Sequence, residues 1–141
     1  MNNIEQPPVT LVTERRDIET GDILALFAHA EWAKRRTAEQ VSRMLHRTEV
    51  IVVAKCQARA VGCARVVTDG VFRAFVEDVI VVPTHRGVGI GRLMINQLEQ
   101  TVRAMGMNRL ELTTTQTGFW ERLGYRQKTE SCYMVKLLPD A

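Results

Sequence analysis

The sequence predicts an α+β fold in which a mixed, largely antiparallel sheet of about six to seven strands is flanked by four helices. Three observations support this. Segments with strand and helix periodicity follow one another in the order β-α-α-β-β-β-α-β-α-β, short turns join the three central strands, and a glycine-rich turn leads into a long amphipathic helix. At 141 residues the chain fits a single domain spanning 1–141, long enough to bury roughly 70% of its unfolded surface.

The first third of the chain predicts one short strand and two helices. The strand covers 9–13, the first helix runs over 20–32, and the second over 37–46, where Thr37 and Gln40 have capping-box spacing. A cationic link that includes Arg35 follows Trp32 and joins the two helices. It is either a substrate-facing loop, with Trp32 and Arg35 as substrate-binding residues, or a solvated basic turn beside a core tryptophan.

The central part predicts an antiparallel meander followed by a crossover. Its strands cover 50–55, 60–67 and 71–82, with Asp69-Gly70 as the strongest turn signal. A helix from Ile90 to the glycine at 106 then returns the chain. A short strand at 110–113 should therefore lie parallel to the strand that ends at Val82. A brief helix at 119–125 and a last strand at 132–138 complete the expected order.

A glycine-rich turn lies between the third central strand and the long helix. The strand ends at Pro83, and three glycines, Gly87, Gly89 and Gly91, follow at every second position before the helix. Backbone amides should converge there at a helix N-terminus, which predicts an anion site suited to phosphate or pyrophosphate. A dinucleotide fingerprint would need a third glycine where Met94 stands, and no nucleotide P-loop lysine follows.

Charge, cysteine and histidine spacing, and the lack of long apolar runs indicate which partners and which cellular environment to expect. Nineteen basic and sixteen acidic side chains give a net charge of +3, and the basic residues are scattered, so nucleic acid is not indicated. The three cysteines form no close pair, and the histidines share no ligand spacing, so we expect no metal. Without a signal-like start or eighteen consecutive apolar residues, we expect a soluble cytoplasmic protein without membrane partners.

The glycine turn resembles the acyl-CoA pyrophosphate signature of the GNAT superfamily of N-acetyltransferases. Arg86, Gly89 and Gly91 stand at the signature positions, Val79-Ile80-Val81 precede them, and Phe119 to Tyr125 resembles a second family segment. The resemblance implies that acetyl-CoA is the co-substrate and that the strand ending at Val82 splays from 110–113 to admit the pantetheine arm. The cofactor-binding residues it implies are Val79, Ile80, Val81, Arg86, Gly87, Val88, Gly89, Ile90, Gly91, Arg92 and Trp120.

Glu77 and Asp78 are the candidate catalytic acids on the strand that leads to this site. Adjacent strand residues face opposite ways, so at most one should point into the cleft, and a bulge would change which one. A carboxylate there is able to take a proton from the attacking ammonium if burial raises its pKa. The alternative is an ion-paired or substrate-orienting acid. Glu77 is the preferred base, and some glucosamine-phosphate acetyltransferases carry a similar Glu-Asp pair.

Trp120 departs from the family pattern because many members carry a tyrosine there that is suggested to protonate the departing thiolate. An indole cannot transfer that proton. Either Tyr133 serves instead or the thiolate, whose thiol has a pKa of about 8.5, leaves unassisted.

The resemblance therefore implies an N-acetyltransferase that moves acetyl from acetyl-CoA to the primary amine of a small molecule by direct attack in a ternary complex. Two alternatives remain open. One is acetylation of a protein or peptide, and the other is a non-catalytic acyl-CoA sensor, which the absence of the tyrosine motivates. A homodimer is common among such proteins.

Overall fold

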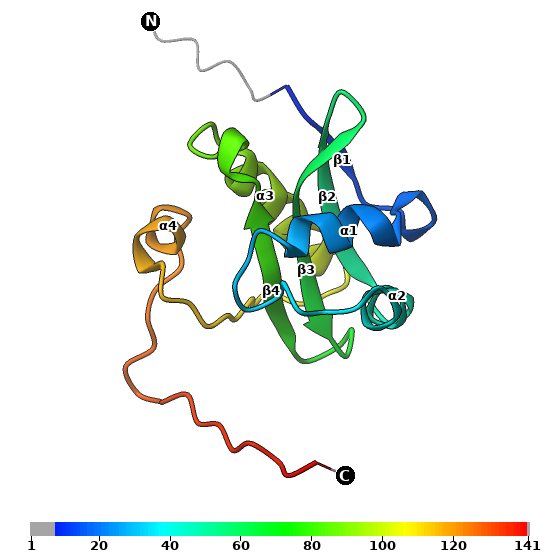
Figure 1. Ribbon diagram of the computed structural model, residues 1–141. Coiled ribbons are helices and arrows are strands. Elements are labelled where there is room, and N and C mark those ends of the chain that lie inside the picture. The colour runs from blue at the N-terminus through cyan, green and yellow to red at the C-terminus, as the bar shows by residue number, and fades with distance from the viewer. Residues whose placement is uncertain (1–7, 141) are drawn as a thin grey trace, which may run out of the picture. The chain divides into compact units, whose positions relative to one another are not determined.

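The computed structural model describes residues 8–140, and its internal contacts separate the chain into two units. The first unit ends at Glu111 and contains the sheet with helices α1, α2 and α3. The second begins at Leu112 and contains helix α4. Figure 1 shows the elements of each unit along the chain.

The first unit is built on a four-stranded sheet in the order β1-β2-β3-β4, with each strand antiparallel to its neighbour. Its strands are β1 Thr10–Val12, β2 Val50–Cys56, β3 Arg59–Thr68 and β4 Ala74–Val81. The predicted meander is confirmed. Strand β4 begins later than expected because the Asp69 carboxylate accepts hydrogen bonds from the amides of Val71, Phe72 and Arg73, at 2.9, 2.7 and 3.0 Å. These bonds, the one from Arg73 foremost, lower the pKa of Asp69 and keep the three residues in the turn.

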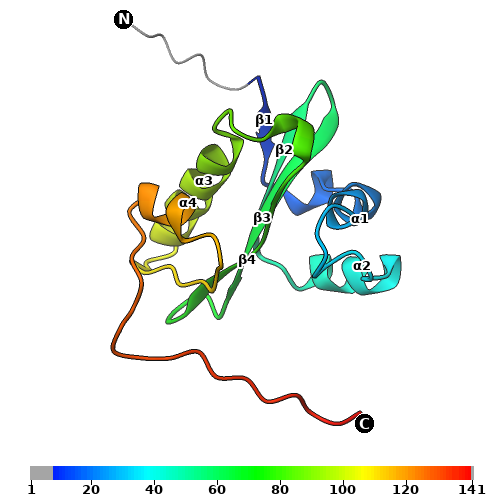
Figure 2. The same ribbon diagram turned by 60° about the vertical axis from the view of Figure 1, so that its left-hand side comes forward.

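Helices cover both faces of this sheet. Figure 2 shows α3 on one side and α1 and α2 on the other. The helices of the first unit are α1 Thr20–Phe27, α2 Ala38–His46 and α3 Ile90–Ala104, with short 3₁₀ turns at Arg15–Asp17 and Pro83–His85. The face under α1 and α2 is apolar where Ile51, Val53 and Cys63 pack against Ile23 and Phe27. The hydrophobic effect of this burial holds the helices to the sheet.

Local signals explain where the two N-terminal helices begin and end. Helix α2 has the predicted capping box, in which the Gln40 amide donates to Thr37 Oγ1 at 3.2 Å and the Thr37 amide donates to Gln40 Oε1 at 2.9 Å. The predicted first helix ends early, at Phe27 rather than near Trp32. After Phe27 the backbone hydrogen bonds span three residues instead of four, as in a 3₁₀ turn. The amides of His29 and Ala30 donate to the carbonyls of Leu26 and Phe27.

The prediction of six to seven strands is wrong for the described residues, which place four strands in the sheet. The expected strand at 110–113 reduces to one bridge between Glu111 and Phe75, although its direction is parallel, as predicted. The expected strand at 132–138 has no regular secondary structure. Strand propensity is realised only where a pairing partner is available, and that partner is not evident from local sequence.

The second unit contains a short helix, α4 Thr117–Arg122, followed by an extended, exposed segment. Trp120 is buried and makes edge-on contacts with Phe119 and Tyr125, each with ring centroids 5.1 Å apart. Such aromatic pairs stabilise beyond the area that they bury. Across residues 8–140, no helix is long and apolar enough to cross a membrane.

Candidate active site

The glycine turn between β4 and α3 has a backbone that only glycine adopts without strain. Gly87 has φ of 79°, and Gly89, the residue that caps α3, has φ of 92°. The first internal bond of α3 runs from the Leu93 amide to the Gly89 carbonyl at 3.1 Å. Amides of the first helical turn have no acceptor within the helix, and together with the helix dipole they are suited to bind an anion.

Arg86 ties this turn to the sheet, because its Nε donates to the Val81 carbonyl at 2.9 Å. The guanidinium is thus positioned where the strand ends and the anion site begins. The side chain is exposed, so its remaining donors face outward from the turn.

At a bulge in β4, the residues whose backbone groups point to the outer edge of the strand change from even-numbered to odd-numbered positions. Before the bulge, the Val76 amide donates outward to the Glu111 carbonyl at 2.8 Å. After it, the Val82 amide donates inward to the Val61 carbonyl of β3 at 2.9 Å. One extra residue on β4, opposite Ala64, accounts for the change, because the register passes from Arg65↔Glu77 to Cys63↔Ile80.

This change of parity turns the backbones of Val79 and Val81 toward the open edge of β4. The sequence-based prediction used the backbones of these two residues for the pantetheine arm, and the geometry is compatible with it. An amide-bearing chain laid along this edge would bond in the manner of an added strand.

Asp78 occupies the bulge and is buried. Its side chain is 1% exposed, and its Oδ2 lies 2.6 Å from Arg65 Nε and 2.9 Å from Arg36 Nη1. Its φ of 57° is in the left-handed region, which aspartate tolerates better than most residues. Two guanidinium groups thus compensate the charge of one buried carboxylate, an arrangement that a buried acid requires.

Glu77 is half-buried and lies in register with Arg65 of β3. Burial raises the pKa of its carboxyl above the ordinary range of a glutamate, and the negative charge of Asp78 adds to the increase. Arg65 and Arg36 oppose it. The structure therefore separates the two predicted acids into one buried, ion-paired residue and one accessible residue with a raised pKa.

The loop between α1 and α2 contributes Arg36, which belongs to the predicted cationic link but was not among the predicted substrate-binding residues. The Arg36 guanidinium lies over the Phe27 ring at 4.7 Å and the Trp32 ring at 5.5 Å. Arg35, the residue selected instead, is exposed. Trp32 is 58% exposed and is joined to the acids through Arg36.

Arg36 and Arg65 carry no motif of their own in the sequence. A buried acid on the strand does imply that a cation must reach it. The sequence does not show which basic residue pairs with Asp78, because Arg36 and Arg65 are 42 and 13 positions away from it along the chain.

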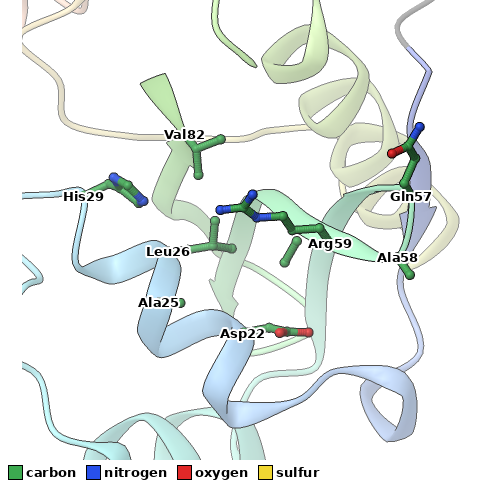
Figure 3. Close-up of a pocket in the computed structure, with 9 residues that line it drawn as sticks. Asp22, Ala25, Leu26, His29, Gln57, Ala58, Arg59 and Val82 are labelled. Atoms are coloured by element: carbon green, nitrogen blue, oxygen red, sulfur yellow. The ribbon is translucent and has the colours of Figure 1, made fainter. Parts of the chain in front are cut away.

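A hollow of about 370 Å³ lies between α1, the turn joining β2 to β3, and the residue after β4. Figure 3 shows the Arg59 guanidinium extending into it toward His29, with Asp22 at another side and Val82 above. Its volume is within the range of small-ligand sites. The polar groups around it carry both signs of charge.

Two further candidates, Trp120 and Tyr133, belong to the second unit. Trp120 is buried, whereas Tyr133 is 74% exposed. Their predicted roles beside the cofactor and as a proton donor stay predictions. Among residues 8–140, the histidines, cysteines and acids form no cluster of three or more that would hold a metal.

A bulged edge strand with outward amides, followed by a glycine turn at a helix N-terminus, is an arrangement suited to a phosphate-bearing ligand laid along a strand. The comparison with family models identifies the class of protein, because residues 16–125 match the Acetyltransferase (GNAT) family. The chain belongs to the GNAT acetyltransferase family.

Individual relatives agree with this assignment. The chain is 32% identical over 114 residues to serotonin N-acetyltransferase 2 of rice, a chloroplastic protein. The matched region covers 77% of this chain but only 56% of the rice protein. A crystal structure assigned to the GNAT family, from Xanthomonas campestris, matches with a TM-score of 0.81 and 25% identity over 95% of this chain and 96% of that one.

A third comparison shows the fold alone. A Mycobacterium tuberculosis protein solved in complex with CoA matches with a TM-score of 0.64 at 22% identity, over 80% of this chain and 70% of that one. The mixed α+β fold with an antiparallel sheet is therefore shared with both solved structures, one of which is assigned to the GNAT family.

Proposed function

We propose that this chain transfers an acetyl group from acetyl-CoA to the primary amine of a small molecule, by direct attack in a ternary complex. The observation that carries the proposal is the continuous path from the outward backbones of Val79 and Val81 to the glycine turn at the start of α3. A strand-like arm ending in a pyrophosphate fits this path.

The donor is acetyl-CoA, whose thioester supplies an activated acetyl group. The residues of the turn fit its pyrophosphate, because the left-handed backbones at Gly87 and Gly89 leave amides without internal acceptors. The amide of Val81 or a neighbour on the same edge is suited to polarise the thioester carbonyl. Holding both reactants at this edge removes much of the entropic barrier to their reaction.

Glu77 acts as the general base. An incoming amine is protonated near neutral pH, and it must lose a proton before its nitrogen forms the new bond to the acetyl carbon. The raised pKa of the Glu77 carboxyl makes it a better proton acceptor than an ordinary glutamate. As the carbon–nitrogen bond forms, the carbon–sulfur bond breaks and CoA departs as the thiolate, and the positively charged nitrogen of the new amide releases its second proton to solvent.

The thiolate departs without a protein acid at position 120. Trp120 has an indole N–H, which donates a hydrogen bond but does not release a proton at accessible pH. A thiol pKa of about 8.5 makes the thiolate a fair leaving group near neutrality.

The hollow beside α1 supports a small acceptor. It reaches Val82, one residue beyond the backbone proposed to bind the donor, and is lined by Asp22, His29 and Arg59. A charged lining of both signs suits an acceptor that carries an ammonium group and a second polar group.

Calorimetry of acetyl-CoA binding tests the donor assignment. The wild-type chain should bind, and the variant Gly89→Trp should not, because a bulky side chain on a left-handed residue disrupts the turn. Gly21→Ala is the matched control, since a Cβ there meets nothing within 4 Å. Equal affinity in wild type and Gly89→Trp would remove acetyl-CoA from the proposal.

An acceptor screen tests the reaction. Amines, amino acids, polyamines and peptides are incubated with acetyl-CoA, and acetylated products are identified by mass spectrometry. Transfer to free amines supports the proposal. Transfer restricted to peptides would make the chain a peptide acetyltransferase, and slow hydrolysis without transfer would make it an acyl-CoA sensor.

A further inference from the structure

Asp78 combines a costly backbone with a buried charge. Its φ of 57° lies in the left-handed region, which residues with a side chain populate sparsely because it strains the backbone. Its carboxylate is 1% exposed. Both features persist only when the surrounding structure holds them in place.

The groups that hold Asp78 come from two other segments. Arg65 approaches from β3, with its Nε 2.6 Å from Asp78 Oδ2. Arg36 approaches from the loop between α1 and α2, with its Nη1 2.9 Å from the same oxygen. Both arginines thus pair with one carboxylate oxygen. Arg65 donates a charge-assisted hydrogen bond to it, and Arg36 adds an ion pair.

Arg36 is itself held in place. Its guanidinium lies over the rings of Phe27 and Trp32, 4.7 and 5.5 Å from their centroids. The side chain is 32% exposed, so its flat group is largely enclosed between the two aromatic residues and the acid. A planar guanidinium makes the ion pair and the stacking contacts together, which an ammonium group does not.

We infer that Asp78, Arg65 and Arg36 form a positioning unit that holds the β4 bulge and thereby aims the Glu77 carboxylate and the outer backbone of Val79. Arg36 is the positioning residue through which the loop between α1 and α2 controls the bulge. The inference rests on the proposed function, because it assigns Glu77 as the base and leaves Asp78 without a proton-transfer role.

The charges around Glu77 make the inference measurable. Three charged groups face it: Asp78 on its own strand, Arg65 on β3 and Arg36 on the loop. Asp78 raises the pKa of the Glu77 carboxyl, whereas both arginines lower it. Removing a member of the unit should therefore move this pKa in a direction that depends on the charge removed.

Carbon-13 NMR titration of the Glu77 carboxyl tests this in the free protein. In Arg36→Met the pKa should shift upward, and in Asp78→Asn it should shift downward, relative to wild type. Arg36→Lys keeps the charge and should restore the pKa toward wild type. Arg43→Met, an exposed arginine on α2, is the matched control and should leave it unchanged.

Opposite shifts in Arg36→Met and Asp78→Asn, together with a lowered kcat in Arg36→Met, support the unit, because a general loss of structure would not give opposite signs and a charge effect alone would not displace the base. An unchanged Glu77 pKa in Arg36→Met, or shifts in the same direction, would overturn it. If Asp78→Asn does not fold, the two Arg36 variants decide, since that side chain is partly exposed.

Kinetics separate this inference from the proposed function. With an acceptor found in the screen, Arg36→Met should lower kcat more than it raises KM for acetyl-CoA, because the glycine turn is intact and only the Val79 backbone of the donor path is displaced. Absence of transfer by the wild-type chain would refute the proposed function, whereas the NMR result would still decide whether the charges are coupled.

Discussion

The donor edge and the acid cluster adjoin on β4 but are built differently. The donor edge consists of backbone groups from one continuous stretch, Val79 through the turn to the start of α3. The acid cluster, defined as Arg36, Arg65, Glu77 and Asp78, consists of side chains from three segments. A site made from consecutive backbone leaves a motif in the sequence, and a site assembled from distant side chains does not.

The two sites should also fail differently when altered. Changes at the donor edge should act on cofactor affinity and leave the fold stable, because the turn is exposed. Changes in the acid cluster should act on stability or on proton transfer, because its central carboxylate is buried. Four predictions test this contrast, beginning with the largest expected effect.

Asp78→Ala should lower the free energy of unfolding by about 3–5 kcal/mol, because it leaves two partly buried arginines without their shared carboxylate. Urea denaturation followed by circular dichroism measures the loss. Asp17→Ala removes an exposed acid and should change stability by less than about 0.5 kcal/mol. A similar small loss in Asp78→Ala would show that the ion pairs do not support the fold.

Glu77→Gln should lower kcat/KM by roughly 100-fold at neutral pH, the lower range for loss of a general base. In the wild type the rate should rise with pH as Glu77 ionises, and the raised pKa places this acid limb above the ordinary range of a glutamate. The variant should lack the limb. A pH–rate profile with the same limb in both proteins would exclude Glu77 as the base.

Gly89→Ala should weaken acetyl-CoA binding by about tenfold. A residue with a Cβ at its φ of 92° is strained by about 1–2 kcal/mol. The free turn relieves this strain by relaxing and must take it up again on binding, and 1.4 kcal/mol corresponds to a factor of ten in affinity. The acid limb of the pH–rate profile, which reports the ionisation of Glu77, should stay at the same pH as in the wild type. A displaced limb without an affinity change would mean that the donor edge and the acid cluster are not separable.

The smallest expected change concerns Cys63, which should not react with a thiol reagent at pH 8. Burial raises its pKa to about 12, with a further contribution from Asp78, so almost no thiolate forms. The exposed Cys132 should react quickly in the same sample, and all three cysteines should react after denaturation. Mass spectrometry of the labelled peptides measures this, and rapid labelling of Cys63 would show that the acid cluster opens.

Local chemistry explains which parts of the fold were predictable. The meander, the capping box at Thr37 and the glycine turn depend on contacts within a few residues, and each is found where it was expected. The segments at 110–113 and 132–138 have strand propensity, yet only Glu111 pairs with the sheet. Pairing depends on residues far away along the chain, which periodicity does not report.

The sequence by itself determined the family and predicted the donor edge, because Arg86, Gly87 and Gly89 lie close together along the chain and encode the backbone geometry that an anion site needs. Only the tertiary structure distinguished the environments of the two acids. Glu77 and Asp78 are adjacent and chemically alike, and an alternation rule does not hold across a bulge. Their difference arises because folding brings Arg36 and Arg65 to Asp78, which buries one charge with its partners and leaves the other accessible.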